Sequence, residues 1–424
     1  MAGFGAASHL HDQGIRAEVY DKNPYFGGHT ASLRDGNGFL FDLGPHISFT
    51  KDSRIQDLLA RNVDDKYSAI QVKLDNYWRG LRLTHPAQLH LNGLPKDLIV
   101  EIVADFVREQ QVERKITNYE DWLVASFGKK FAELFPMQYT RKYHLTSASN
   151  MTTDWLGPRI YRPSLEEVLR GALAPWTPDV HYINTFRYPT EGGFASYLAP
   201  FPKIANLNLG HELIAIDPLQ RELRFANRRK ASYDQLISSI ALPDLVAMIA
   251  GAPRDVVDAS RRLACSTCVL VNVGVDRTDL SDAHVTYFYD ADIAFTRLSF
   301  PHMLAASNAP QGCGSVQAEV YFSDKYRPLT QAPADLIDPV IGDLYKAGIL
   351  REGDAILSRH AAVVRYANVI FDLERAPALA IVHGYLDEQG IGYCGRYGDW
   401  AYIWTDESFM SGENAAQRVL DGLG

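Results

Sequence analysis

The sequence has few cysteines, no long apolar run and no excess of positive charge. Its four cysteines among 424 residues form no regular framework, which fits a reducing cytoplasm rather than a disulfide scaffold. No apolar run approaches the roughly 20 residues that cross a bilayer, and no secretory signal is visible. The formal net charge of −9 gives no electrostatic basis for nucleic-acid binding. We therefore expect a cytoplasmic protein without a membrane span that binds no nucleic acid.

Patterns typical of metal sites are also lacking. Cys265 and Cys268 have a C-x-x-C spacing, but residues 265–273 read as the entry to a buried strand. The histidines are scattered and show no H-x-x-x-H pair, so we expect no metal. What the sequence does have is 22 tyrosines. Tyrosine offers a stacking face together with a hydroxyl, which hints at a polar pocket with aromatic walls.

The first motif lies at the beginning of the chain. Residues 1–10 read as the last third of a dinucleotide-binding turn that runs into its helix, with Gly3 as the third glycine. A complete fingerprint has a buried strand and two further glycines upstream, so we expect these to precede residue 1 in a longer chain. A helix over 4–13 and a strand over 17–20 follow and end at Asp21. Asp21 lies roughly 20 residues after Gly3, where a carboxylate accepts hydrogen bonds from a ribose; a solvent-exposed Asp21 in a plain βαβ unit is the alternative.

Two glycine-containing segments come next. Gly27 and Gly28 allow the backbone to approach a phosphate closely, and residues 38–46 read as a strand ending in a Gly-Pro-His turn. This order of acidic residue, Gly-Gly and Asp-x-Gly-x-His resembles the FAD-binding start of the glutathione-reductase-like flavoproteins. That group includes amine oxidases, protoporphyrinogen oxidases and UDP-galactopyranose mutases. The resemblance places three residues against the isoalloxazine ring of FAD: Gly44, Pro45 and His46.

Two arginines lie in aromatic, apolar surroundings. Arg159 ends the segment 155–159, and Arg297 ends the segment 287–297. Structural ion pairing is one interpretation, and a diphosphate clamp is the other, because a guanidinium fork matches phosphate oxygens. Both segments resemble the arginine-bearing segments of the eukaryotic-type UDP-galactopyranose mutases. There each arginine holds the diphosphate of the nucleotide sugar.

The C-terminal region carries a further block that resembles these flavoproteins. A Gly-Arg turn at Gly395 and Arg396 precedes an aromatic segment and a helix around Met410. The resemblance implies that Arg396 contacts the FAD pyrophosphate and that the N-terminus of the Met410 helix points N–H groups at the flavin. It also implies that Tyr366 and Tyr402 line the substrate pocket and that His46 acts at the flavin N5.

The resemblance is partial at the substrate side. Met303 stands where the mutases have a tyrosine, and the segment between Tyr402 and Phe409 is two residues short of their pattern. Those positions handle the sugar and phosphates. FAD binding therefore carries over further than the reaction on galactose.

The expected fold is α/β, with two interleaved units in addition to a helical insert. A Rossmann-like, glutathione-reductase-type FAD-binding domain without its N-terminal strand is expected from residues 1–75, 187–250 and 385–424. The helical insert is expected over 76–186, and an antiparallel β substrate domain over 251–384. Residues 206–209, 213–216 and 222–225 further predict a small β-meander.

Three functions remain open at this point. The resemblance implies an FAD-dependent mutase-like enzyme acting on a nucleotide-activated sugar in surface polysaccharide biosynthesis, with NAD(P)H as a candidate reductant. The alternative is an FAD-dependent oxidoreductase of the amine oxidase or protoporphyrinogen oxidase type, which transfers hydride from substrate to flavin. The third is an inactive fragment that binds no FAD because its first strand is missing. In the first case Arg159 and Arg297 hold the leaving diphosphate.

Overall fold

The computed structural model describes residues 1–175 and 183–422; residues 176–182 of the expected insert, and 423–424, lie outside the described part. The first half contains seven α-helices within that part. They are α1 (Ala2–Asp12), α2 (Ser53–Asn62), α3 (Lys96–Glu109), α4 (Tyr119–Phe127), α5 (Lys129–Leu134), α6 (Pro136–Tyr143) and α7 (Leu165–Leu173). The second half contains α8 (Leu242–Met248), α9 (Arg254–Arg262), α10 (Pro301–Leu304), α11 (Ile337–Lys346), α12 (Arg375–Glu388), α13 (Gly395–Gly398) and α14 (Thr405–Asp421).

The strands are mostly short in the first 240 residues and long afterwards. The earlier ones are β1 (Glu18–Tyr20), β2 (Ser32–Arg34), β3 (Leu40–Asp42), β4 (Tyr67–Gln71), β5 (Leu74–Trp78), β6 (Leu81–Thr84), β7 (Thr185–Pro189), β8 (Asn206–Asn208), β9 (Leu213–Asp217), β10 (Glu222–Phe225), β11 (Lys230–Ser232) and β12 (Leu236–Ser238). The later ones are β13 (Thr267–Val275), β14 (Val285–Phe288), β15 (Arg297–Ser299), β16 (Gly314–Phe322), β17 (Ile356–Val364) and β18 (Ile391–Tyr393).

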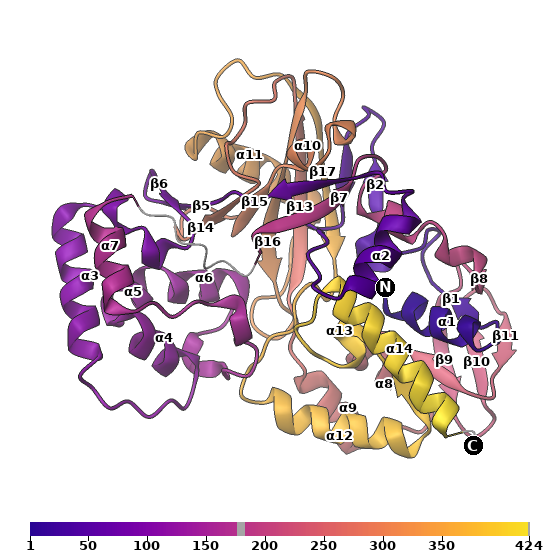
Figure 1. Ribbon diagram of the computed structural model, residues 1–424. Coiled ribbons are helices and arrows are strands. Elements are labelled where there is room, and N and C mark those ends of the chain that lie inside the picture. Colours follow the sequence, from indigo (N-terminus) through magenta and orange to yellow (C-terminus); the bar gives the residue numbers. More distant parts are fainter. Residues whose placement is uncertain (176–182, 423–424) are drawn as a thin grey trace.

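The parallel strand pairs and the helices α1 and α14 form one part of the molecule. β1 pairs in parallel with β8, and β12 pairs in parallel with β18, as in a Rossmann-like unit. The helix and strand expected over 4–13 and 17–20 are confirmed as α1 and β1. The helices α1 and α14 lie against each other on the right-hand side of Figure 1. Segments from both ends of the chain therefore build this part together.

The expected meander is only half correct. β9, β10 and β11 form a three-stranded antiparallel sheet, but β8 is not a member of it. Asn206–Asn208 instead pairs with β1, with Glu18 opposite Asn206. The apolar pattern predicted the strand, whereas its partner lies almost 190 residues away in the sequence.

A seven-stranded mixed sheet forms the second part, in the order β17-β13-β16-β15-β14-β5-β6. Every residue of β16 is buried, and β13 is buried apart from its first residue. These two strands pair with each other in antiparallel along their whole length. β5 and β6, from residues that the sequence groups with the helical insert, extend this sheet, with β5 parallel to β14. The division of the chain into domains stays a prediction.

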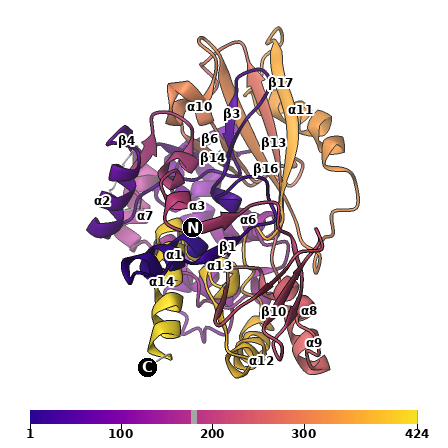
Figure 2. The ribbon, with the colours of Figure 1, turned by 90° about the vertical axis from the view of Figure 1, so that its right-hand side faces the viewer.

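Helices α3 to α7 gather at one side of the molecule, at the left of Figure 1. A shared apolar core includes Ile102, Leu123, Phe131 and Val168 from these helices. Helices α8, α9 and α12 lie together at the end of the molecule opposite β17 and α11 (Figure 2). In the described part of the chain, no helix is long and apolar enough to cross a membrane. Nor does that part bring together three His, Cys, Asp or Glu side chains that could bind a metal.

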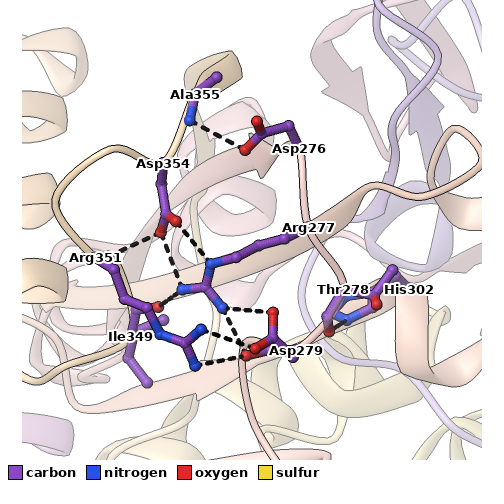
Figure 3. A network of polar contacts seen from close by, with 9 residues as sticks. All are labelled: Asp276, Arg277, Thr278, Asp279, His302, Ile349, Arg351, Asp354 and Ala355. Atoms are coloured by element: carbon purple, nitrogen blue, oxygen red, sulfur yellow. Dashed lines mark hydrogen bonds and ion pairs between the residues drawn. The ribbon is translucent and has the colours of Figure 1, made fainter.

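An ion-pair network ties the end of β13 to the start of β17 (Figure 3). Arg277 donates to both carboxylate oxygens of Asp354, over 2.8 and 3.0 Å, and to the Ile349 carbonyl over 2.7 Å. It also donates to the Asp279 carbonyl over 2.6 Å. The Asp354 side chain is only 7% exposed. Removing Arg277 would therefore leave a buried carboxylate without its cation.

We expect Arg277→Met to lower the free energy of unfolding by about 3 kcal/mol, because an unpaired buried charge is costly. Arg351→Met is the matched control. Arg351 pairs with Asp279 over 2.8 Å, but both side chains are more than half exposed, and such pairs contribute less than about 1 kcal/mol. Urea unfolding of both variants measures the difference. Equal losses would show that burial does not decide the strength of this network.

Candidate functional site

One large cavity, with a volume of about 1600 Å³, runs through the middle of the molecule. Its walls come from the start of α1, the glycine turns after β1 and β3, β12, α13, and strands β14 to β16. In the described residues β1 pairs only with β8 and β12 only with β18, and both strands border this cavity. The cavity thus joins the Rossmann-like part to the seven-stranded sheet.

Glycines let α1 and α14 touch backbone to backbone at one end of the cavity. A Cβ on Gly5 would lie 2.0 Å from the Phe409 carbonyl oxygen, and one on Gly412 would lie 2.0 Å from the Ala2 carbonyl oxygen. Gly3 lines the cavity, but a Cβ there would meet nothing within 4 Å. Close backbone packing of α1 thus occurs at Gly5, against the helix α14. A cofactor contact at Gly3 stays a prediction.

The turn after β1 presents an acidic side chain and two glycines to the cavity. Asp21 accepts hydrogen bonds from the backbone and side-chain nitrogens of Asn23, at 2.8 and 3.0 Å. Gly27 and Gly28 have φ angles of 100° and 57°, which disfavour other residues. All three line the cavity, and their contact with a cofactor stays a prediction. His29 follows them, and its Nδ1 lies 3.0 Å from the Tyr397 hydroxyl.

The turn after β3 fixes one histidine ring. Gly44 has a φ of 103°, and the Nδ1 of His46 donates to the Gly44 carbonyl over 2.9 Å. Burial, with Arg396 and Arg297 nearby, lowers the pKa of His46 to about 3. The ring is therefore neutral with its proton on Nδ1, and Nε2 remains an acceptor. Gly44, Pro45 and His46 all line the cavity.

A buried carboxylate supports this turn. Asp42, the last residue of β3, accepts hydrogen bonds from the Ser32 hydroxyl (2.5 Å), the Tyr188 hydroxyl (2.7 Å) and the Phe194 N–H (3.1 Å). Its carbonyl accepts from Gln317 of β16 over 2.9 Å. Burial raises the pKa of Asp42 to about 6, although these three hydrogen bonds lower it.

The raised pKa of Asp42 predicts a pH dependence of stability. Between about pH 4 and pH 6 the folded state holds the Asp42 proton more tightly than the unfolded state, so stability falls as pH rises through this window. Asp42→Asn removes that titration. We expect wild type to lose about 2.5 kcal/mol relative to Asp42→Asn between pH 4 and pH 7, because the pKa is raised by roughly two units and the unfolded side chain is already partly ionised at pH 4. Thermal unfolding at both pH values tests this, and a difference independent of pH would contradict it.

Arg396 lines the cavity, but its guanidinium donates hydrogen bonds to backbone carbonyls. Its Nε and Nη2 donate to the Ile403 carbonyl over 2.9 and 2.6 Å, and its Nη1 donates to the Ala367 carbonyl over 3.2 Å. The guanidinium also lies over the Tyr402 ring, 5.3 Å from its centroid. Arg396 therefore holds the segment between α13 and α14, and its contact with a pyrophosphate stays a prediction. Gly395, which precedes it, also lines the cavity.

Arg159 lies between two aromatic rings, 4.8 Å from the centroid of Tyr402 and 5.3 Å from that of Trp404. Its Nη2 donates to the Tyr402 carbonyl over 2.5 Å and its Nη1 to the Trp155 carbonyl over 3.2 Å. Its Nε is buried without a hydrogen-bond partner. In the described residues no carboxylate lies within ion-pair distance of Arg159.

Arg297 differs because it has a carboxylate partner. Its Nε and Nη2 both lie 2.9 Å from Oε1 of Glu319. The two residues stand directly opposite each other on β15 and β16, and both line the cavity. The sequence singles out Arg297 but gives no signal for Glu319, whose partner is set by strand register.

The other predicted residues have mixed outcomes. Tyr366 and Tyr402 line the cavity; Tyr366 donates to Asp244 over 2.7 Å, and the Tyr402 hydroxyl lies 3.1 Å from that of Tyr143. Met410 is not among the residues that line the cavity in the described part. Its helix begins at Thr405, so Met410 lies in the second turn and packs against an apolar cluster. The helix expected around Met410 is present, and Glu407 accepts from the Trp404 N–H at its start. Thr405, its first residue, lines the cavity, and a contact of Met410 or of the helix N-terminus with a flavin stays a prediction.

Several cavity residues were missed from the sequence. They are mainly tyrosines of α6 and of the sheet: Tyr139, Tyr143, Tyr287, Tyr289 and Tyr321. The four-residue spacing on α6 and the alternation on β14 put these side chains on one face. The abundance of tyrosine was the signal that could have found them.

Comparisons with known proteins agree with this architecture. Residues 1–61 match the NAD(P)-binding Rossmann-like domain family. A crystal structure of reduced UDP-galactopyranose mutase is similar over 100% of this chain and 94% of that chain, with a TM-score of 0.91 and 26% identity. A putative protoporphyrinogen oxidase from Exiguobacterium sp. 255-15 is similar over 99% and 97% of the two chains (TM-score 0.73, 15% identity). An oxidoreductase from Methanosarcina mazei is similar over 99% and 98% (TM-score 0.62, 12% identity).

These similarities confirm the expected resemblance and fold class. The chain has the mixed α/β fold of UDP-galactopyranose mutase, with a Rossmann-like dinucleotide-binding domain. The two matches of lower identity share the fold alone. The similar mutase is an enzyme, which supports an enzyme here, and the Rossmann-like domain fits a dinucleotide cofactor.

Proposed function

We propose that this protein is an FAD-dependent enzyme that acts on a nucleotide-activated sugar in the manner of UDP-galactopyranose mutase. The observation that carries the proposal is the single cavity, which contains both a dinucleotide-type turn and a chamber lined by arginines and tyrosines. One ligand would bind at the dinucleotide-type turn, and a second ligand with anionic groups would bind in the chamber lined by arginines and tyrosines. The setting would be surface polysaccharide biosynthesis, as in the family that the sequence resembles.

The residues of the first region fit FAD. Asp21 offers a carboxylate to ribose hydroxyls, and the positive φ angles of Gly27 and Gly28 expose backbone where a phosphate would lie. A Cβ on Gly28 would meet nothing within 4 Å, so the backbone there is open to the cavity. The turn at Gly44 and His46 would lie against the ring. Reduced FAD, when bound, supplies a nucleophilic nitrogen, N5, toward the anomeric carbon of the sugar.

His46 has the chemistry to accept a hydrogen bond at the flavin. Its proton is committed to the Gly44 carbonyl, and its pKa of about 3 keeps the ring neutral throughout the physiological range. Nε2 can therefore accept from an N–H group, but the ring adds no positive charge to the cavity. This hydrogen bond would orient the ring rather than transfer a proton.

Arg159 would hold the diphosphate of the substrate. A phosphate oxygen carries a full negative charge and a carbonyl oxygen only a partial one, so the guanidinium attracts a phosphate more strongly in a buried chamber. A phosphate can therefore displace the carbonyls of Tyr402 and Trp155 that the guanidinium now binds. The Tyr402 and Trp404 rings hold the guanidinium in place. The geometry supports positioning and charge stabilisation as the contribution of these side chains.

Spectroscopy of the purified protein tests the proposal. Flavin absorbance shows whether FAD is bound, and titration with UDP and UDP-galactose under dithionite shows whether the second region responds. We expect bound flavin, a UDP-dependent spectral shift, and interconversion of the pyranose and furanose forms of the sugar. If flavin is bound but its spectrum does not change with UDP, the function is that of a net oxidoreductase instead. Absence of flavin would overturn the proposal.

A further inference from the structure

Five arginines line the cavity, and the partners of the three that the sequence singles out, Arg159, Arg297 and Arg396, differ. Arg159 donates to carbonyl oxygens, and Arg396 donates to carbonyl oxygens and to the side-chain oxygen of Asn368. Arg297 forms an ion pair with a carboxylate, that of Glu319, as Arg365 does with Asp244. Glu319 therefore sets Arg297 apart from the other two.

Both carboxylate oxygens of Glu319 accept hydrogen bonds. Its Oε1 accepts from Nε and Nη2 of Arg297, at 2.9 Å each, and its Oε2 accepts from the Tyr321 hydroxyl. The residue is 1% exposed and lies in the middle of β16, whose residues are all buried. Because β15 and β16 are antiparallel and place Arg297 opposite Glu319, neither side chain can leave the other without repacking the sheet.

Arg297 stays charged. Burial lowers the pKa of Arg297, but Glu319 and the neighbouring tyrosines Tyr321, Tyr143 and Tyr139 outweigh it, so this pKa lies well above its usual value. Glu319, its ion-pair partner, lies beside this cation in the cavity wall. A charge placed in such a buried chamber acts more strongly on a ligand than it would in water.

We propose that Glu319 is a specificity-determining residue that limits the negative charge of the ligand that the chamber accepts; this inference rests on the proposed function. A nucleotide sugar carries two negative charges on its diphosphate. A free nucleoside diphosphate carries about three near neutral pH, because its terminal phosphate ionises with a pKa near 6. Glu319 therefore repels the free diphosphate more strongly and favours the sugar-bound form.

Binding measurements with three ligands test this inference: uridine, UDP-galactose and UDP. Glu319→Gln frees the charge of Arg297 while keeping the side-chain shape. For this variant we expect the ratio of UDP affinity to UDP-galactose affinity to be about tenfold higher than for wild type. The affinity for uridine should stay unchanged. The double variant Arg297→Gln/Glu319→Gln restores the net charge and should restore the wild-type ratio.

Glu413→Gln is the matched control. Glu413 also pairs with an arginine, Arg54, over 2.6 Å with a side chain only 16% exposed, but it does not line the cavity. It should leave all three affinities unchanged. Thermal unfolding confirms that each variant is folded.

Two results would overturn the inference. If Glu319→Gln changes the affinity for all three ligands by one factor, Glu319 only positions Arg297. If the UDP to UDP-galactose ratio stays at the wild-type value, Glu319 does not select by charge. Failure of the wild-type protein to bind UDP or UDP-galactose is a separate outcome, which overturns the proposed function itself and the inference with it.

Discussion

Arg159→Met is expected to weaken UDP binding by at least a hundredfold while FAD remains bound. Arg159 is the cavity arginine that has a buried donor without a partner, the Nε atom, and no carboxylate within reach in the described structure. Losing two charge-assisted hydrogen bonds to a phosphate removes about 3 kcal/mol of binding free energy. Methionine retains apolar contact with the Tyr402 and Trp404 rings. The dissociation constant from calorimetric titration with UDP measures the effect.

Arg79→Met provides the control for Arg159→Met. Arg79 also stacks on an aromatic ring, with its guanidinium carbon 4.9 Å from the centroid of Trp78, but it does not line the cavity. This variant should bind UDP as wild type does. If Arg159→Met binds UDP normally, the diphosphate is held elsewhere in the chamber. Loss of flavin together with UDP would instead place Arg159 at the cofactor.

Short-range patterns predicted the glycine turns on one side of the cavity. Asp21, Gly27 and Gly44 line the cavity, and their contact with a cofactor stays a prediction. A glycine turn after a strand is a local structure that needs few distant contacts. The same holds for α1 and β1, whose apolar periodicity and flanking glycine set their extents to within about two residues. The local sequence of such segments is enough to predict their structure.

Features that depend on pairing between distant strands were not predictable. β8 has the pattern of a strand, but only the folded chain shows that it pairs with β1 and not with β9. Glu319 is an ordinary acidic residue in the sequence, and it becomes a chamber residue because the register of β15 and β16 sets it opposite Arg297. The substrate side of the cavity is built from such pairings, so its residue set was largely missed.

The same limit applies to the contact between α1 and α14. The fingerprint assigns its third glycine, Gly3, to packing of the helix on a strand. The structure shows a different contact, between the two helices, at Gly5 and Gly412. The two helices are almost 400 residues apart in the sequence, and no local pattern predicts that they pack together.

Gly412→Ala is expected to destabilise the protein strongly and to release FAD. An added Cβ would lie 2.0 Å from the Ala2 carbonyl oxygen and 2.8 Å from the Ala6 nitrogen, and these backbone atoms cannot move without moving α1. Overpacking of this kind costs about 3 kcal/mol. Because the start of α1 also lines the cavity, displacing the helix would open the cofactor end. Thermal unfolding and flavin content of the purified variant measure the two effects.

Gly384→Ala separates this steric clash from the general effect of adding a methyl group to a helical glycine. Gly384 lies on the exposed face of α12, and a Cβ there would meet nothing within 4 Å. Alanine is favoured over glycine in a helix by roughly 0.5–1 kcal/mol, so this variant should be slightly more stable and keep its flavin. If Gly412→Ala unfolds at the wild-type temperature and retains flavin, α1 and α14 do not pack as closely as their glycines allow. If it unfolds early but retains flavin, the helix contact stabilises the fold without shaping the cofactor end.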